Sequence, residues 1–202
     1  MWWINFPAAI GVRKVLAPQA DQHVGPWDSA DASRPDPPSD WMPVELGAML
    51  LYVPQDFEIR LEVREDDQSV LSVDVLHNDL TLQVMPYAGP RGSGIWDEVS
   101  SALAEAIATD GGTSAPYPSG YGTQLLASLK NEGSSVQARF LGFDGPRWFV
   151  RAVISGPLAH DDQAVQPFLD VINQVVVVRD DLARPMQEPL ELSLPSDLPP
   201  VV

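Results

Sequence analysis

The chain has 202 residues, with 12 lysines and arginines against 28 aspartates and glutamates, so its formal net charge is −16 at pH 7. Because lysine and arginine carry phosphate binding, this balance argues against nucleic acid and anionic membrane surfaces as partners. Apolar residues make up 45% of the chain and charged residues 20%, as in ordinary globular domains. The absence of cysteine excludes disulfides, thiolate nucleophiles and cysteine zinc sites, and it fits a cytoplasmic location.

Proline and acidic residues divide the chain into three parts. Residues 1–43 have no periodic apolar face, and we expect an extended, flexible arm in which Trp27 either anchors the arm to the domain or engages a partner. The apolar opening is too short to span a bilayer and lacks the preceding cation of a signal peptide, so no integral membrane segment is expected. Residues 44–182 should form a single domain, and residues 183–202 an acidic, proline-rich tail.

Four consecutive strands are expected at the start of the domain. The clearest is residues 57–64, where apolar and charged side chains alternate with period two. The others are residues 46–53, 70–76 and 80–85. Because the connections between these segments are short, the pattern predicts an antiparallel meander.

A helix is expected next, over residues 95–109. Trp96 begins an apolar stripe with helical spacing, and Ser93 or Gly94 is in position to cap the helix. Residues 115–122, rich in tyrosine, proline and glycine, predict a loop, and residues 123–129 a strand.

The centre of the predicted fold is a hairpin over residues 136–156. Its turn is Asp144-Gly145-Pro146, a strong hairpin signal between two strand-like runs, and its aromatic residues supply more apolar surface than any other stretch. A second helix should begin at Asp161, with Pro167 in or near its first turn, followed by a buried strand at residues 175–178. Alternating leucines at 190–194 predict an edge strand. The sequence therefore predicts an α+β fold, a twisted and mainly antiparallel sheet with two main helices packed on it.

Four segments resemble an uncharacterised actinobacterial family of domains of unknown function: GPWD, GIWDEV, DGPRWFVRAVISG and VVVVRDD. The resemblance extends from Gly25 to Pro195, whereas the opening MWWINFPAAI departs from the family's pattern. It implies intracellular proteins with no established activity and no catalytic residues to carry over. The order of the elements also resembles the Mog1/PsbP type of sandwich, which implies a non-catalytic binding or assembly domain.

Motifs for catalysis and metal binding are weak. The three histidines have no acidic partner at ligand spacing, so neither a metal site nor a cofactor is predicted. Ser155 lacks a nucleophile elbow and is interpreted as a turn serine. Arg91 precedes a helix in GPRGSG, but the acidic first turn of that helix opposes an anion there.

The leading hypothesis is a non-enzymatic binding or assembly module. Alternation places Arg147, Phe149 and Arg151 on one face of a strand, where an aromatic between two guanidinium groups favours a partner-binding patch together with Trp27. The alternative role of these arginines is to pair with acidic residues across the sheet.

A second hypothesis places a small molecule or a lipid in a pocket between the first helix and the sheet. Tyr87, Arg91 and Trp96 would line this pocket, with or without hydrolase activity. The two hypotheses predict different surfaces: a protein partner requires an exposed patch, whereas a small ligand requires a concave site.

Overall fold

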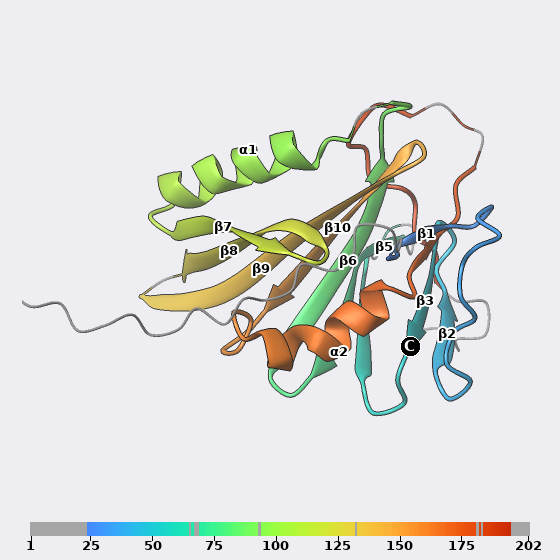
Figure 1. The fold of residues 1–202 in the computed structure, drawn as a ribbon, viewed down its shortest axis with the longest axis horizontal. Helices are drawn as coiled ribbons and strands as arrows, with labels where there is room; N and C mark the ends of the chain where they lie inside the picture. The colour runs from blue at the N-terminus through green and yellow to red at the C-terminus, as the bar shows by residue number, and fades with distance from the viewer. Residues whose placement is uncertain are drawn as a thin grey trace, which may run out of the picture.

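The computed structural model describes residues 24–64, 66, 69–92, 94–131, 133–180, 182 and 184–194 (Figure 1). The apolar N-terminal run, His23 and the suggested cap Ser93 lie outside these residues. The described chain forms two β-sheets and two helices.

The larger sheet has seven strands in the order β4-β5-β6-β10-β9-β8-β7, and all neighbouring strands are antiparallel. Their bounds are Glu58–Val63 (β4), Val70–His77 (β5), Leu80–Ala88 (β6), Thr113–Ser119 (β7), Gly122–Asn131 (β8), Ser134–Gly145 (β9) and Trp148–Ser155 (β10). The predicted central hairpin is confirmed, since β10 occupies the middle position of this sheet. Its turn is formed by Pro146 and Arg147, and Arg147 has a positive φ of 65°.

The smaller sheet has the order β1-β11-β3-β2. Its strands are Trp27–Asp28 (β1), Met42–Glu45 (β2), Met49–Val53 (β3) and Val176–Val177 (β11). Only β1 and β11 pair in parallel. The expected four-strand meander is therefore wrong in its first member, because β3 pairs with β2 and β11 instead of β4. Strands of two to four residues are too short to show a sequence pattern.

Strand β7 corrects a second expectation, because it occupies most of the segment predicted as a loop. Pro116 and Pro118 lie within it, and neither can donate a backbone hydrogen bond. The strand is at the edge of the sheet and pairs only with β8, so one side of its backbone needs no ladder partner. Proline is tolerated at such an edge, which is why composition alone was misleading here.

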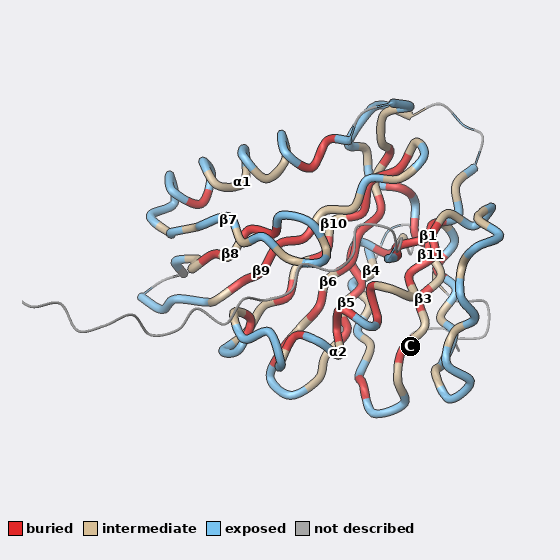
Figure 2. The backbone as a smooth tube through the Cα atoms, in the orientation of Figure 1, coloured by how far each residue is buried: buried red, intermediate tan, exposed pale blue. Residues whose placement is uncertain are grey.

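The two helices are Trp96–Thr109 (α1) and Asp162–Ile172 (α2). They pack on opposite faces of the large sheet, as alternation along β10 makes clear. Trp148 and Val150 join the core that contains α2 and the small sheet, whereas Phe149 joins a separate core under α1. The buried stretches follow the middle strands in Figure 2, while the outer side of α1 is exposed. The expected α+β architecture is thus confirmed, with the second sheet as an addition.

The helix ends are fixed in two different ways. Asp161 caps α2 as predicted and accepts hydrogen bonds from the amides of Gln163 at 3.0 Å and Ala164 at 2.8 Å. Pro167, however, lies inside the helix beyond its first turn. Helix α1 has no local side-chain cap, and its first amides are bound by Asp144 from the hairpin turn. The Asp144 carboxylate accepts from the amide of Ile95 at 2.8 Å.

We expect Asp144→Ala to lower the free energy of unfolding by about 1 kcal/mol, because it removes the acceptor for the amides at the start of α1. Urea denaturation at neutral pH measures this change. Asp144→Asn is the matched control, since it keeps one oxygen acceptor and should retain most of the stability. Equal stability of the alanine variant and the unchanged chain would contradict this capping role.

Candidate functional site

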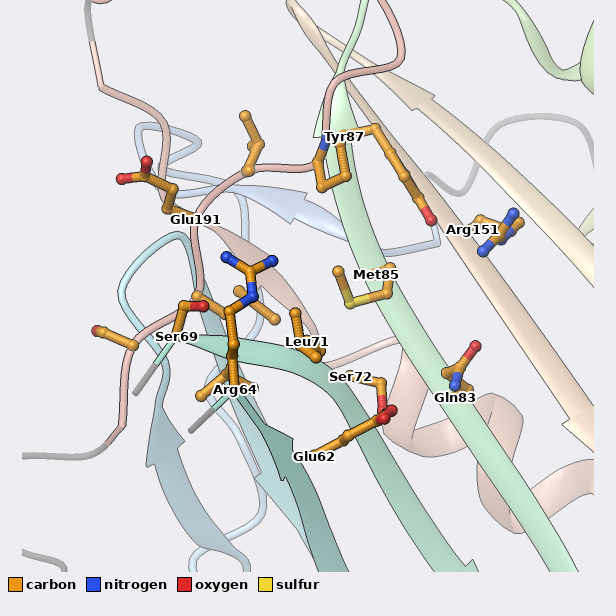
Figure 3. Close-up of a pocket in the computed structure, with 15 residues that line it drawn as sticks. Glu62, Arg64, Ser69, Leu71, Ser72, Gln83, Met85, Tyr87, Arg151 and Glu191 are labelled. Carbon is orange, nitrogen blue, oxygen red and sulfur yellow. The ribbon is translucent and has the colours of Figure 1, made fainter. Parts of the chain in front are cut away.

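The candidate site is a hollow on the face of the large sheet that carries α1. Helix α1 packs over β7, β8 and β9 and leaves the neighbouring half of this face open. The hollow has a volume of about 740 Å³ and lies over β4, β5, β6 and β10. On β6, Gln83, Met85 and Tyr87 project into it, and Met85 pairs with Arg151 of β10 (Figure 3).

The segment after β11 forms one wall of the hollow. Its backbone is tied to two strands: the Leu190 amide donates to the carbonyl of Pro86 at 3.0 Å, and the Val70 amide donates to the carbonyl of Leu192 at 3.2 Å. Leu190 and Leu192 are both 3% exposed, so their side chains anchor this segment in the core. The predicted edge strand is therefore a row of isolated bridges, and residues 189–193 form the rim of the hollow.

Tyr87 and Arg151 are the central pair of polar side chains in the hollow. The guanidinium carbon of Arg151 lies 5.3 Å from the centre of the Tyr87 ring, close enough for a cation–π interaction. Burial raises the pKa of Tyr87, and the Arg151 charge offsets only part of that effect. The Tyr87 hydroxyl is therefore protonated at neutral pH and is able to donate a hydrogen bond. In Figure 3 the Tyr87 side chain extends toward Arg151.

Charges of both signs surround this pair. Glu62 and Arg64 come from the end of β4, and Glu191 comes from the rim. The hydroxyl of Ser72 donates to Glu62 at 3.2 Å, while the amide nitrogen of Gln83 donates to Asp74 at 3.3 Å. The hollow therefore offers hydrogen-bond donors and acceptors side by side. It is suited to a polar ligand more than to a hydrocarbon chain.

The residues predicted for the two hypotheses are distributed differently in the structure. Tyr87 and Arg151, which came from separate hypotheses, lie together in the hollow. Phe149 and Trp96 are 2% and 7% exposed, and their rings stack between α1 and the large sheet with centres 6.2 Å apart. Phe149 therefore belongs to a core and not to an exposed patch. Arg91 is exposed and lies outside the lining of the hollow.

Trp27 anchors the arm, in agreement with the first of its two expected roles. Its side chain is 5% exposed, and its indole nitrogen donates to the carbonyl of Asn173 at 2.7 Å. The next residue, Asp28, accepts a hydrogen bond from the indole nitrogen of Trp148 at 2.9 Å. Residues 24–43 are thus joined to the domain through β1, β2 and these tryptophan contacts.

The tryptophan-containing segments of the sequence have structural roles. The Trp96 indole nitrogen donates to the carbonyl of Thr123 at 2.6 Å. Gly142 leaves room for this ring, because a Cβ at that position would approach a Trp96 ring atom to 2.1 Å. The segments that carry the family resemblance therefore hold α1, the hairpin and the arm together.

Sequence reasoning missed most of the lining of the hollow. Gln83 and Met85 alternate with core residues along β6. The side of this predicted strand that faces away from the main core was therefore the available signal for the lining. The contribution of residues 189–193 had no such signal, because their place depends on tertiary contacts.

Within the ranges that the structure describes, no group of three or more histidine, aspartate or glutamate side chains is placed to hold a metal ion. His160 lies with a ring nitrogen 3.0 Å from the carbonyl of Ala127, and His77 stacks on Phe57 with ring centres 4.2 Å apart. These contacts give both histidines a packing role. None of the described helices has the length and apolar character needed to cross a membrane.

Two sheets with a helix on each face of the larger one define an α+β sandwich. Residues 25–200 match the family model described as "Protein of unknown function (DUF3710)", and the chain belongs to this family. The predicted membership in a family of unknown function is thereby confirmed. No curated protein matches the chain.

Among solved structures, the chain is similar to a protein from Bacteroides thetaiotaomicron, with 12% identity and a TM-score of 0.40. That match covers 66% of this chain and 46% of the other, so this chain spans less than half of that relative. It is also similar to cyanobacterial PsbP (CyanoP) from Synechocystis, with 12% identity and a TM-score of 0.41. Here the match covers 76% of this chain and 99% of the other.

Proposed function

We propose that the protein is a non-enzymatic binding module whose hollow receives a carboxylate-bearing polar segment of a partner protein. The observation that carries this proposal is the Tyr87–Arg151 pair on an open sheet face. In the described part of the chain, no residue accepts a hydrogen bond from Arg151 or forms an ion pair with it. An arginine fork beside a protonated hydroxyl is well suited to a carboxylate, because both groups donate to its oxygens.

The remaining lining favours a peptide over a lipid. Glu62 and Glu191 would meet amide N–H groups or a basic side chain of the same segment, while Leu71 and Met85 supply apolar contact. A hydrocarbon chain would bury these charges without partners, which is costly. The volume of about 740 Å³ lies within the usual range for ligand sites. A small polar molecule in the same hollow is the alternative.

The arrangement supports binding more than catalysis. Ser72 is 6% exposed and its hydroxyl is bonded to Glu62, without a histidine between them in the described chain. Serine activation generally uses such a base. Binding through fixed donors and acceptors accounts for the lining without a chemical step.

A photo-crosslinking residue in place of Leu71 tests the proposal, because this side chain lines the hollow and is 39% exposed. We expect crosslinks to one partner protein in cell lysate and at least a tenfold loss of crosslinking with Arg151→Gln, since a charge-assisted bidentate contact disappears. Lys130→Gln removes an exposed positive charge from the distant strand β8 and should leave the yield unchanged.

Two results would contradict the proposal. One is equal crosslinking in Arg151→Gln and the unchanged chain. The other is equal crosslinking to the same protein from position 158, since Leu158 is 53% exposed but does not line the hollow. A small molecule that co-purifies and is lost in Arg151→Gln would favour the alternative ligand.

A further inference from the structure

A second cavity lies on the other side of the rim, where the chain leaves β11. It has a volume of about 290 Å³, and its charged lining residues are Arg179, Asp180, Arg184 and Glu191. This place is separate from the hollow on the sheet face, although residues 190 and 191 of the rim contribute to both.

The two arginines have buried N–H groups without acceptors among the described residues. In that part of the chain, the Nε and Nη1 atoms of Arg179 and the Nε atom of Arg184 are buried and have no hydrogen-bond partner. Buried donors are normally paired, and leaving one unpaired is costly, more so for a charged group. Donors left in this way at the wall of a cavity indicate that an acceptor belongs there.

The charges around Arg179 point the same way. Burial lowers the pKa of Arg179, and the nearby Arg147 guanidinium lowers it further, while Asp180 acts in the opposite direction. The Nη2 atom of Arg179 donates to the carbonyl of Leu182 at 3.3 Å, and no carboxylate within the described ranges forms an ion pair with Arg179. The cavity thus holds two guanidinium groups beside the carboxylates of Asp180 and Glu191, and only Arg184 is paired with carboxylates among the described residues.

Arg184 is held in place by acidic neighbours. Its Nη2 atom lies 2.7 Å from the Asp180 carboxylate, and its Nη1 atom lies 3.9 Å from that of Glu188. Its side chain is 14% exposed. These contacts use the end of the guanidinium group and leave Nε without a partner among the residues that the structure describes. Asp180 and Glu191 both line the cavity, and their negative charges limit how much anionic charge the site accepts.

We propose that this cavity binds a phosphate group, as the free ion or as a phosphomonoester. Its unpaired donors come from two guanidinium groups, so an acceptor with several oxygens on one centre satisfies them better than a carboxylate does. Arg147 at the hairpin turn adds long-range attraction. Because the donor atoms are buried, binding involves a small rotation of the Arg179 side chain toward the cavity opening.

Titration of the full chain with inorganic phosphate at constant ionic strength tests this proposal. Calorimetry should give saturable binding of one phosphate per chain, and Arg179→Gln should weaken it at least tenfold. Lys130→Gln, which removes an equal charge elsewhere, should bind like the unchanged chain, and so should Arg151→Gln if the two sites are independent. O-phosphoserine in place of phosphate distinguishes the sources, because tighter binding of the ester identifies a phosphomonoester ligand.

Thermal unfolding supplies a second readout that does not depend on measuring heat. Without phosphate, Arg179→Gln should unfold at the same temperature as the unchanged chain or a higher one, since it removes a poorly compensated buried charge. Phosphate should raise the unfolding temperature of the unchanged chain but not of this variant. The proposal is overturned if phosphate does not saturate the unchanged chain, or if Arg179→Gln and Lys130→Gln bind it equally.

Discussion

Arg139→Ala should lower the free energy of unfolding by about 3 kcal/mol, among the largest effects in this fold. The Arg139 side chain is 1% exposed and joins the large sheet to α2. Its Nε atom donates to the carbonyl of Ala159 at 2.9 Å, and its Nη1 atom donates to Gln124 at 3.2 Å and to Asp162 at 2.9 Å. Alanine would leave a cavity, and the buried oxygen atoms of Ala159 and Gln124 would lose their hydrogen-bond donor.

Two further variants separate the parts of this effect. Arg139→Met fills most of the volume, so its smaller loss measures the polar contacts alone. Asp162→Asn keeps an acceptor and should cost about 1 kcal/mol, because water reaches a carboxylate that is 60% exposed. Urea denaturation measures all three variants at pH 7. If Arg139→Ala is as stable as the unchanged chain, the network does not hold α2 to the sheet.

This network also predicts a dependence on pH. Burial would raise the pKa of Asp162, but the hydrogen bonds from Tyr117 and Arg139 and the Arg139 charge outweigh it and lower the pKa. A lowered pKa in the folded state means that the stabilisation is complete above the ordinary carboxyl pKa and is lost as the pH falls through the lowered value. The loss of stability between neutral and acidic pH should therefore be smaller in Asp162→Asn than in the unchanged chain.

Trp96→Ala should cost about 3 to 5 kcal/mol, since it empties the core between α1 and the sheet. The ring is 7% exposed, stacks on Phe149 and donates to the carbonyl of Thr123 at 2.6 Å. Trp96→Phe is the matched control: it keeps an aromatic ring against Phe149 and loses the hydrogen bond, so about 1 to 2 kcal/mol is expected. Denaturant unfolding followed by circular dichroism measures both.

A loss of less than about 1 kcal/mol in Trp96→Ala would contradict the core position of this ring. Such a result would instead support the prediction that Trp96 lines a pocket, because a ring that faces a ligand contributes less to the free energy of unfolding. If Trp96→Ala loses the expected free energy of unfolding and Trp96→Phe still captures the ligand, Trp96 has a role in folding and none in binding at the hollow.

The sequence predicted those parts of the fold that depend on local patterns. The hairpin at Asp144 and the two helices follow from turn chemistry and from the spacing of apolar residues. The small sheet could not be predicted, because its outer strands are short and pair across large distances in sequence, as Trp27 does with Val176. The cap of α1 was missed for the same reason, since Asp144 lies 49 residues from the amide of Ile95.

The candidate site was only partly predictable. Arg151 and Tyr87 were singled out separately, and the register of β6 against β10 brings them together. Trp27 and Phe149, the aromatic residues predicted for a partner-binding patch, are buried instead. Large aromatic side chains contribute most to a core, so prominence in a sequence is weak evidence for a binding surface.

The most direct test of the central claim compares capture with folding in one double variant, Tyr87→Phe/Arg151→Gln. Native mass spectrometry of the tagged protein from lysate records what remains bound, and thermal unfolding records stability. The proposed binding module predicts a partner protein bound to the unchanged chain and absent from the double variant, with unfolding temperatures within a few degrees. A partner that stays bound to a folded double variant would show that the hollow is not its binding site.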